Sequence, residues 1–180
     1  SNIPTFISSV NLILTSLMSL ILSRTKIKIQ KKSWQFFGII FFFLAIDEAA
    51  MIHERLGEIL VLFSKNIFLF FNPPWINIYL PLAAIFLLLC FKFLKILEFR
   101  KLSILISLIM YIFAAIFLEF LYFNYPNLLS GMSYSTIEES IEIMSIIYLN
   151  YNLLLILEKN NYSVSFVFGQ SFIKNKKIIK

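Results

Sequence analysis

Residues 102–123 read LSILISLIMYIFAAIFLEFLYF and contain one charged side chain, that of Glu119. A helix needs about 20 predominantly apolar residues to cross the ~30 Å hydrocarbon core of a bilayer. This segment therefore predicts a transmembrane helix, and other blocks of similar composition predict four more. The five predicted spans are residues 3–23, 34–52, 76–97, 102–123 and 137–157.

The composition of the whole chain supports the same fold class. Of its 180 residues 59% are apolar and 14% are charged, whereas soluble domains are about half apolar and about a quarter charged. With only four Gly and five Pro, the apolar blocks favour long helices over the short, turn-separated strands of a barrel. We predict an all-α integral membrane protein whose residues 1–159 form a single bundle, followed by a basic tail at 160–180.

The basic residues predict the orientation of the bundle, because short cytoplasmic loops collect Lys and Arg. Two of the 16 Lys and Arg, Arg55 and Lys65, lie between the second and third spans. The other fourteen flank the first and third connections or follow the last span: Arg24, Lys26, Lys28, Lys31, Lys32, Lys92, Lys95, Arg100, Lys101, Lys159, Lys174, Lys176, Lys177 and Lys180. Five spans with the N-terminus outside and the C-terminus inside account for this distribution.

Two segments outside the spans have patterns of their own. After span two, apolar residues recur at i, i+3, i+4 and i+7, with charged residues on the other faces: Leu56, Ile59, Leu60 and Phe63 against Glu54, Arg55 and Glu58. This spacing predicts an amphipathic helix that continues span two along the outer interface. In the tail, the alternation over residues 163–168 is compatible with a short strand or a partner-docking arm.

Polar residues inside two spans predict contacts between helices. Ser8, Thr15 and Ser19 recur along one side of span one, where small hydroxyl residues permit close packing and interhelical hydrogen bonds. Asn150 and Asn152 lie deep in span five, where an unsatisfied amide is costly. We expect at least one of them to have a hydrogen-bond partner within the bundle or in another subunit.

Apart from Glu98 and Glu158, the acidic residues gather at the end of the bundle opposite to the basic ones. An ionisable side chain at membrane depth costs several kcal/mol unless it is paired, hydrated or protonated, so it normally faces the bundle interior. We therefore predict an intramembrane acidic cluster of Asp47, Glu48, Glu119, Glu138 and Glu142. Asp47 and Glu119 are the deepest, and we expect them to share a proton, an ion or a water.

This cluster is compatible with several chemistries. It could relay protons, supply general acid and base groups, or hold a divalent cation with His53, Asp47 and Glu119 as ligands. Structural alternatives exist as well, because Ser135 and Thr136 each precede a Glu by three residues, as in a capping box at the start of span five. His53 could be an interfacial residue, and Glu54 and Glu58 could be solvated.

The sequence lacks the motifs of several well-known catalytic and metal sites. His53 is the only His, so neither an HExxH zinc site nor a three-His site can be built from the chain. No Walker loop, GxGxxG or GxSxG motif occurs. The single Cys90 excludes a disulfide within the chain and any CxxC motif. The short basic loops do not suggest nucleic acid as a partner.

Four functions remain open. The preferred hypothesis is a non-catalytic subunit of a larger membrane complex, with the lipid bilayer and other membrane subunits as partners. The alternatives are a cation or proton pathway, a membrane-embedded enzyme that uses the carboxylates with His53, and a pigment or haem protein ligated by His53. The composition is compatible with a bacterial inner membrane, a thylakoid or another organellar membrane.

Overall fold

A computed structural model describes residues 3–25, 28–63, 70–94, 100–125, 131–159, 162–164 and 173–175. Its helices are α1 (Ile3–Thr25), α2 (Lys28–Ala50), α3 (Ile52–Phe63), α4 (Ile76–Leu94), α5 (Lys101–Ile112), α6 (Glu119–Asn124) and α7 (Gly131–Lys159). A π-helical segment, η2 (Phe113–Leu118), joins α5 to α6. Two short antiparallel strands, β1 (Tyr162–Val164) and β2 (Ile173–Asn175), follow α7. The predicted strand at 163–168 overlaps β1, and residues 165–168 lie outside the described residues.

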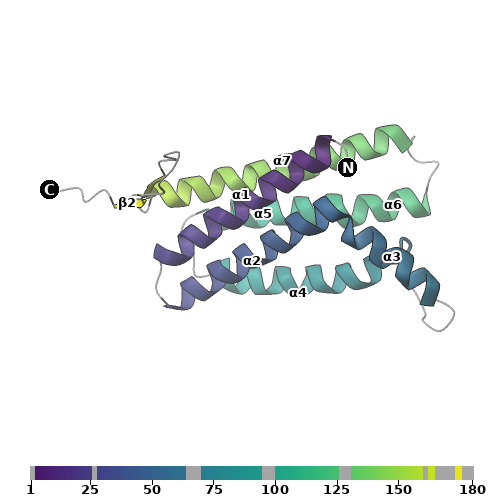
Figure 1. The fold of residues 1–180 in the computed structure, drawn as a ribbon, viewed down its shortest axis with the longest axis horizontal. Coiled ribbons are helices and arrows are strands. Elements are labelled where there is room, and N and C mark those ends of the chain that lie inside the picture. Colours follow the sequence, from purple (N-terminus) through teal and green to yellow (C-terminus); the bar gives the residue numbers. More distant parts are fainter. Residues whose placement is uncertain are drawn as a thin grey trace.

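Five helices are long and apolar enough to span a membrane, which confirms the helical fold class for the part of the chain described. They cover Ile3–Arg24, Gln30–Ala50, Ile76–Leu94, Lys101–Asn124 and Tyr134–Lys159, so α5, η2 and α6 together form one span. Figure 1 shows these helices running alongside one another, with α1 packed against both α2 and α7. The helix α4 packs mainly on α5, and α3 turns away from the end of α2.

Two helices begin earlier than the spans predicted from the sequence. The helix α2 begins at Lys28 and not at residue 34, and α7 begins at Gly131 and not at residue 137. Ser135 and Thr136 therefore lie inside α7 and cannot be its N-caps, so the capping-box alternative is wrong. The first turns of α7 are stabilised by tertiary packing, because the ring of Tyr134 stacks on that of Tyr122 with centroids 4.5 Å apart.

The predicted polar contacts between helices are confirmed for Thr15 and Asn150, whereas the Ser19 hydroxyl donates within its own helix. The Ser16 hydroxyl donates to the carbonyl of Gly38 over 2.8 Å, which ties α1 to α2. The Thr15 hydroxyl donates to Asn150 Oδ1 over 2.7 Å, which ties α1 to α7, and Asn150 Nδ2 donates to the Asn11 carbonyl. Close approach at Gly38 is required, since a Cβ there would lie 2.9 Å from Leu20 Cδ2.

The outer surface of the spans is apolar, in contrast to these buried polar contacts. Large apolar side chains with more than a third of their surface exposed occur on every span; examples are Phe6, Leu17, Ile39, Phe42, Leu82, Leu88, Ile109, Phe113, Met144 and Leu154. Such an arrangement suits a lipid solvent, in which apolar side chains face hydrocarbon and polar side chains bond between helices.

Candidate functional site

Asp47 is the centre of a hydrogen-bonded group where α2 meets α3. The chain leaves α2 at Met51 with a φ of 50°, which a residue other than Gly rarely adopts, and this turn directs His53 back toward Asp47. Asp47 Oδ1 accepts the backbone N–H of His53 over 2.9 Å, and Oδ2 lies 3.2 Å from His53 Nδ1. Asp47 Oδ1 also accepts the Tyr79 hydroxyl of α4 over 2.9 Å.

The amphipathic segment was predicted to continue span two. The turn corrects this, because α2 ends at Ala50 and α3 is a separate helix, so Asp47 and Glu54 do not lie on one continuous helix. Asp47 contacts His53 instead. Because the Asp47 side chain receives an N–H from the first turn of α3, it caps that helix and offsets the strain at Met51.

Glu119 is held by a different partner. Trp75 Nε1 donates to Glu119 Oε1 over 3.2 Å. Trp75 follows the loop Asn72-Pro73-Pro74, and the side chain of Asn77 fixes the conformation of this loop. Asn77 Oδ1 accepts hydrogen bonds from the backbone N–H groups of Phe70 and Phe71. Asn77 Nδ2 donates to two loop carbonyls. A well-bonded loop therefore positions the indole that meets Glu119.

The π-helical segment directly before Glu119 sets the direction in which this carboxyl group points. Residues 113–118 have the wider π turn, which shifts every later side chain around the helix axis relative to α5. Ile116 of η2 packs in a small cluster with Trp75 and Ile76, so the wider turn faces α4. Such π turns are frequent at functional sites.

Three aromatic rings lie between the two carboxylates. The ring centroids of His53 and Trp75 are 5.0 Å apart, and those of Trp75 and Tyr79 are 5.2 Å apart, both nearly edge to face. Asp47 and Glu119 thus belong to one connected group, in which Asp47 bonds His53 and Tyr79 and Glu119 bonds Trp75. No bond directly joins the two carboxylates in the described part of the chain, and the expected sharing of a proton or ion between them stays a prediction.

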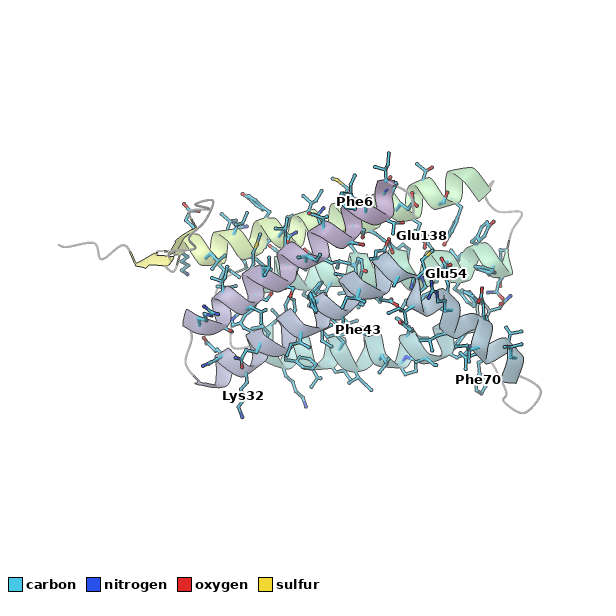
Figure 2. The ribbon with its side chains drawn as sticks, viewed as in Figure 1. Phe6, Lys32, Phe43, Glu54, Phe70 and Glu138 are labelled. Carbon is cyan, nitrogen blue, oxygen red and sulfur yellow. The ribbon has the colours of Figure 1, made fainter. Side chains whose placement is uncertain are left out.

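The helix α7 provides the opposite wall. Glu138 and Glu142 are half-buried there, and each interacts electrostatically with Glu119. Glu48 of α2 interacts with Glu142 across the gap. Figure 2 shows Glu54 and Glu138 toward one end of the bundle and Lys32 at the other. The structure therefore brings all five residues of the predicted acidic cluster to the same region.

These residues line a cavity of about 1110 Å³. This volume slightly exceeds the usual range of pockets that hold small molecules, about 300–1,000 Å³. All five carboxylates of the predicted cluster line it, together with His53 and the aromatic residues Trp75, Tyr79, Tyr111, Tyr122 and Tyr134. No Lys or Arg lies in its described lining.

The end of the bundle where Lys32 lies has an apolar interior. Phe41 and Leu108, which line the cavity, belong to a buried cluster that also contains Trp34, Phe37 and Phe93. The centroids of Trp34 and Phe93 are 4.9 Å apart. Apart from Asp47, no acidic or basic side chain is fully buried among the described residues.

The predicted metal site was built on His53, Asp47 and Glu119. Within the described residues no group of three or more His, Cys, Asp and Glu side chains could hold a metal ion. The oxygens of Asp47 are already bonded to His53 and Tyr79. Binding of a divalent cation at these residues is therefore a prediction from the sequence alone.

The environment of His53 changes its protonation. Burial favours the neutral ring and lowers the pKa, but the hydrogen bond and charge of Asp47, with the charges of Glu119 and Glu48, outweigh this and raise the pKa above its usual value near 6.5. His53 is therefore a stronger base than a free imidazole. Because Asp47 occupies the region of Nδ1, the other ring nitrogen, Nε2, is the one left for a ligand.

The raised pKa of His53 gives stability a defined pH dependence. The protonated ring stabilises the folded state fully below about pH 6.5, and this contribution is lost as the pH rises through the higher pKa of the folded state. We expect His53→Gln to lower the free energy of unfolding by about 1.5 kcal/mol below pH 6.5 and by less once the pH exceeds the pKa of the folded state. Thermal unfolding in detergent in both pH ranges measures this difference. Equal losses at both would contradict it, and Glu58→Gln on the exposed face of α3 is the control.

Geometry and composition together define the class of this protein: a polytopic helical membrane protein with an acidic cavity among its helices. Residues 3–156 match the family described as a domain of unknown function, DUF8692, and the chain belongs to that family. No curated protein and no solved structure matches the chain.

Three residues of the site were not identified from the sequence. Trp75 was identifiable only as an aromatic after the Pro-Pro pair, Tyr79 lies in an apolar block, and Tyr134 precedes the predicted start of span five. Their roles depend on the turn at Met51 and on the early start of α7. Neither feature has a clear signal in the sequence.

Proposed function

We propose that this protein is a membrane-embedded enzyme that acts by general acid and base catalysis on a molecule entering from the outer side of the membrane. The observation that carries the proposal is the Asp47–His53 pair at the wall of the acidic cavity. A carboxylate that bonds Nδ1 of an imidazole fixes its tautomer and orientation, so that Nε2 can take a proton from a substrate or a water.

The other walls supply the complementary acids. Glu119, Glu138 and Glu142 line the same cavity as His53, and a carboxylic acid in a poorly hydrated site can donate a proton to a leaving or developing anionic group. His53 takes up a proton, Asp47 stabilises the resulting imidazolium, and one of the glutamates returns a proton to the substrate. The reaction class is proton abstraction or the activation of a water.

The absence of buried charge beyond the acidic cluster favours an enzyme over a cation or proton pathway. A pathway needs hydrated or ionisable groups along its whole length, because an ion is costly in hydrocarbon. Apart from Asp47, no acidic or basic side chain is fully buried among the described residues, and Trp34, Phe37 and Phe93 pack together at the other end of the bundle. Ionisable groups gathered at one end suit binding and chemistry better than transport.

The cavity also favours an enzyme over the non-catalytic subunit that the sequence suggested. A subunit that acts only by packing sideways needs no internal volume, and ionisable groups at depth reduce the stability of the bundle. Nine Asp, Glu and His side chains line one cavity, namely those of the acidic cluster, His53, Glu54, Glu58 and Glu139. Retaining such an arrangement is typical of functional sites, where stability is given up for chemistry.

Isotope incorporation tests the proposal without knowledge of the substrate. The protein in liposomes of its source membrane lipids, incubated in D2O and H2¹⁸O, is expected to introduce deuterium or ¹⁸O into one lipid class. His53→Gln is expected to slow incorporation at least about 100-fold, in the range of general base catalysis. Glu158→Gln, at the far end of α7, is the control. Incorporation no greater than in protein-free liposomes would contradict the enzyme.

The orientation of the bundle is part of this proposal. Lys31 and Lys32 lie at the end of α2 opposite to the acidic cavity (Figure 2), as expected if the cavity faces outside. Exposed apolar side chains of α3, Ile59, Val61 and Leu62, suit a helix lying in the outer interface.

Accessibility reporters test this orientation. A reporter in the connection between α1 and α2 and another at the C-terminus are expected to be cytoplasmic, because both regions are rich in Lys and Arg. A reporter near residue 127 is expected outside. Finding residue 127 and the C-terminus on one side would contradict an odd number of spans.

A further inference from the structure

The acidic cavity continues into an apolar groove between α2 and α4. Phe36, Ile40 and Phe43 of α2 face Leu82, Ile85 and Leu89 of α4 in the lining of the same cavity. In Figure 2, Phe43 lies between the ribbons of these two helices. Most of these side chains are more than a third exposed, so the groove opens toward the lipid.

The length of the groove fits a hydrocarbon chain. From Phe36 to Asp47 the helix rises about 16 Å, at ~1.5 Å per residue. This is about half of the ~30 Å hydrocarbon core, or the depth of one leaflet. A chain lying along the groove would place its head group beside Asp47 and Glu48, three residues or fewer from the end of α2 at Ala50.

The polar end of the cavity has the chemistry of a site for a cation. It is lined by five carboxylates of the acidic cluster and by aromatic faces, which together attract ammonium groups. Tyr134 also belongs to this polar end: its side chain is 5% exposed, it lines the cavity, and its hydroxyl interacts with Glu138.

We infer that the cavity and groove bind a cationic amphiphile, one hydrocarbon chain ending in an ammonium group and carrying no phosphate. The inference rests on the proposed function, because it names the class of substrate. An anionic or zwitterionic phospholipid is disfavoured, since its phosphate would face the carboxylates of Glu138 and Glu142 with no Lys or Arg in the described lining.

Direct binding tests the inference. The probe is a dodecylammonium with a nitroxide on its head group, which quenches nearby tryptophan; in a Trp34→Phe background, Trp75 is the only tryptophan and reports occupancy. We expect saturable quenching, and competition by dodecylamine at least about tenfold stronger than by dodecanol or laurate. Equal competition by all three would overturn the inference, as would stoichiometric binding of Ca²⁺ or Mg²⁺ that displaces the probe.

Matched variants locate the two parts of the site. Glu138→Gln with Glu142→Gln is expected to weaken probe binding at least about tenfold, whereas Glu158→Gln on the same helix is expected to leave it unchanged. Ala83→Leu, which narrows the cavity beside the cluster of Trp75 and Ile116, is expected to weaken probe binding, and Ala84→Leu, at the adjacent exposed position, is not. If Ala83→Leu does not fold, a series of probe chain lengths replaces it. If the affinity of the probes, corrected for their partition into micelles, did not depend on chain length, the groove would not be the binding site of the hydrocarbon chain.

Binding and catalysis can fail separately. His53→Gln removes the proposed base but no carboxylate, so it is expected to keep probe affinity within about threefold while it stops isotope incorporation. Probe binding without incorporation by the unmodified protein would leave the ligand class intact and contradict the enzyme. Isotope incorporation into a lipid without an ammonium group, with no probe binding, would support the enzyme and contradict the ligand class.

Discussion

Asp47→Ala is expected to lower the free energy of unfolding by about 3 kcal/mol, near the lower end of the cost of breaking a buried charged pair. Asp47 is 5% exposed and accepts hydrogen bonds from three groups, namely the His53 backbone, the His53 ring and the Tyr79 hydroxyl. Alanine leaves all three without their acceptor, and α3 loses the side chain that caps its first turn. Thermal or denaturant unfolding in detergent measures the loss.

Two control variants separate this role from simple removal of a charge. Asp47→Asn retains Oδ1, which can still accept from the His53 backbone and from Tyr79, so we expect a loss of about 1 kcal/mol. Glu48→Ala removes the adjacent carboxylate, for which no hydrogen bond is found in the described residues, and we expect little change or a gain. Equal losses from Asp47→Ala and Glu48→Ala would contradict the hydrogen-bonded role of Asp47.

The sequence predicted the spans because they depend on a property that sums over many residues. A run such as 102–123 remains apolar whatever its neighbours do, and a bilayer permits few alternatives to a helix for such a run. Helix ends were less predictable. Tyr134 extends α7 through its contact with Tyr122, a residue of another helix, and no local pattern records that contact.

The candidate site was predictable in its residue types but not in its bonds. Asp47, Glu119, Glu138 and Glu142 were identified because an ionisable side chain within the membrane is energetically costly, and these side chains do line one cavity. The partner of Asp47 was not predictable, because it depends on the left-handed conformation of Met51, which the sequence does not encode through a Gly. The π turn of η2 is also without a sequence signal, yet it sets the position of Glu119 around its helix.

Trp75→Ala is expected to cost about 3–5 kcal/mol of unfolding free energy, the usual range for deleting a buried Trp. The side chain is 4% exposed and packs with Ile76 and Ile116, so its removal leaves a void beside the π turn of η2. It also removes the only hydrogen bond found for Glu119 in the described residues. Phe70→Ala, in the same loop but 77% exposed, is the control and should change stability by less than about 0.5 kcal/mol.

Trp75→Phe separates the packing of the ring from its hydrogen bond. Phe keeps most of the ring contacts with His53 and Tyr79 but has no N–H, so we expect a loss of about 1–2 kcal/mol. If this loss reflects the bond to Glu119, then Glu119→Ala combined with Trp75→Phe should be less destabilising than the two single variants added together, with a coupling of about 1 kcal/mol. Strict additivity in this double-mutant cycle would show that Trp75 acts through packing alone, and that Glu119 is oriented by the π turn without help from the indole.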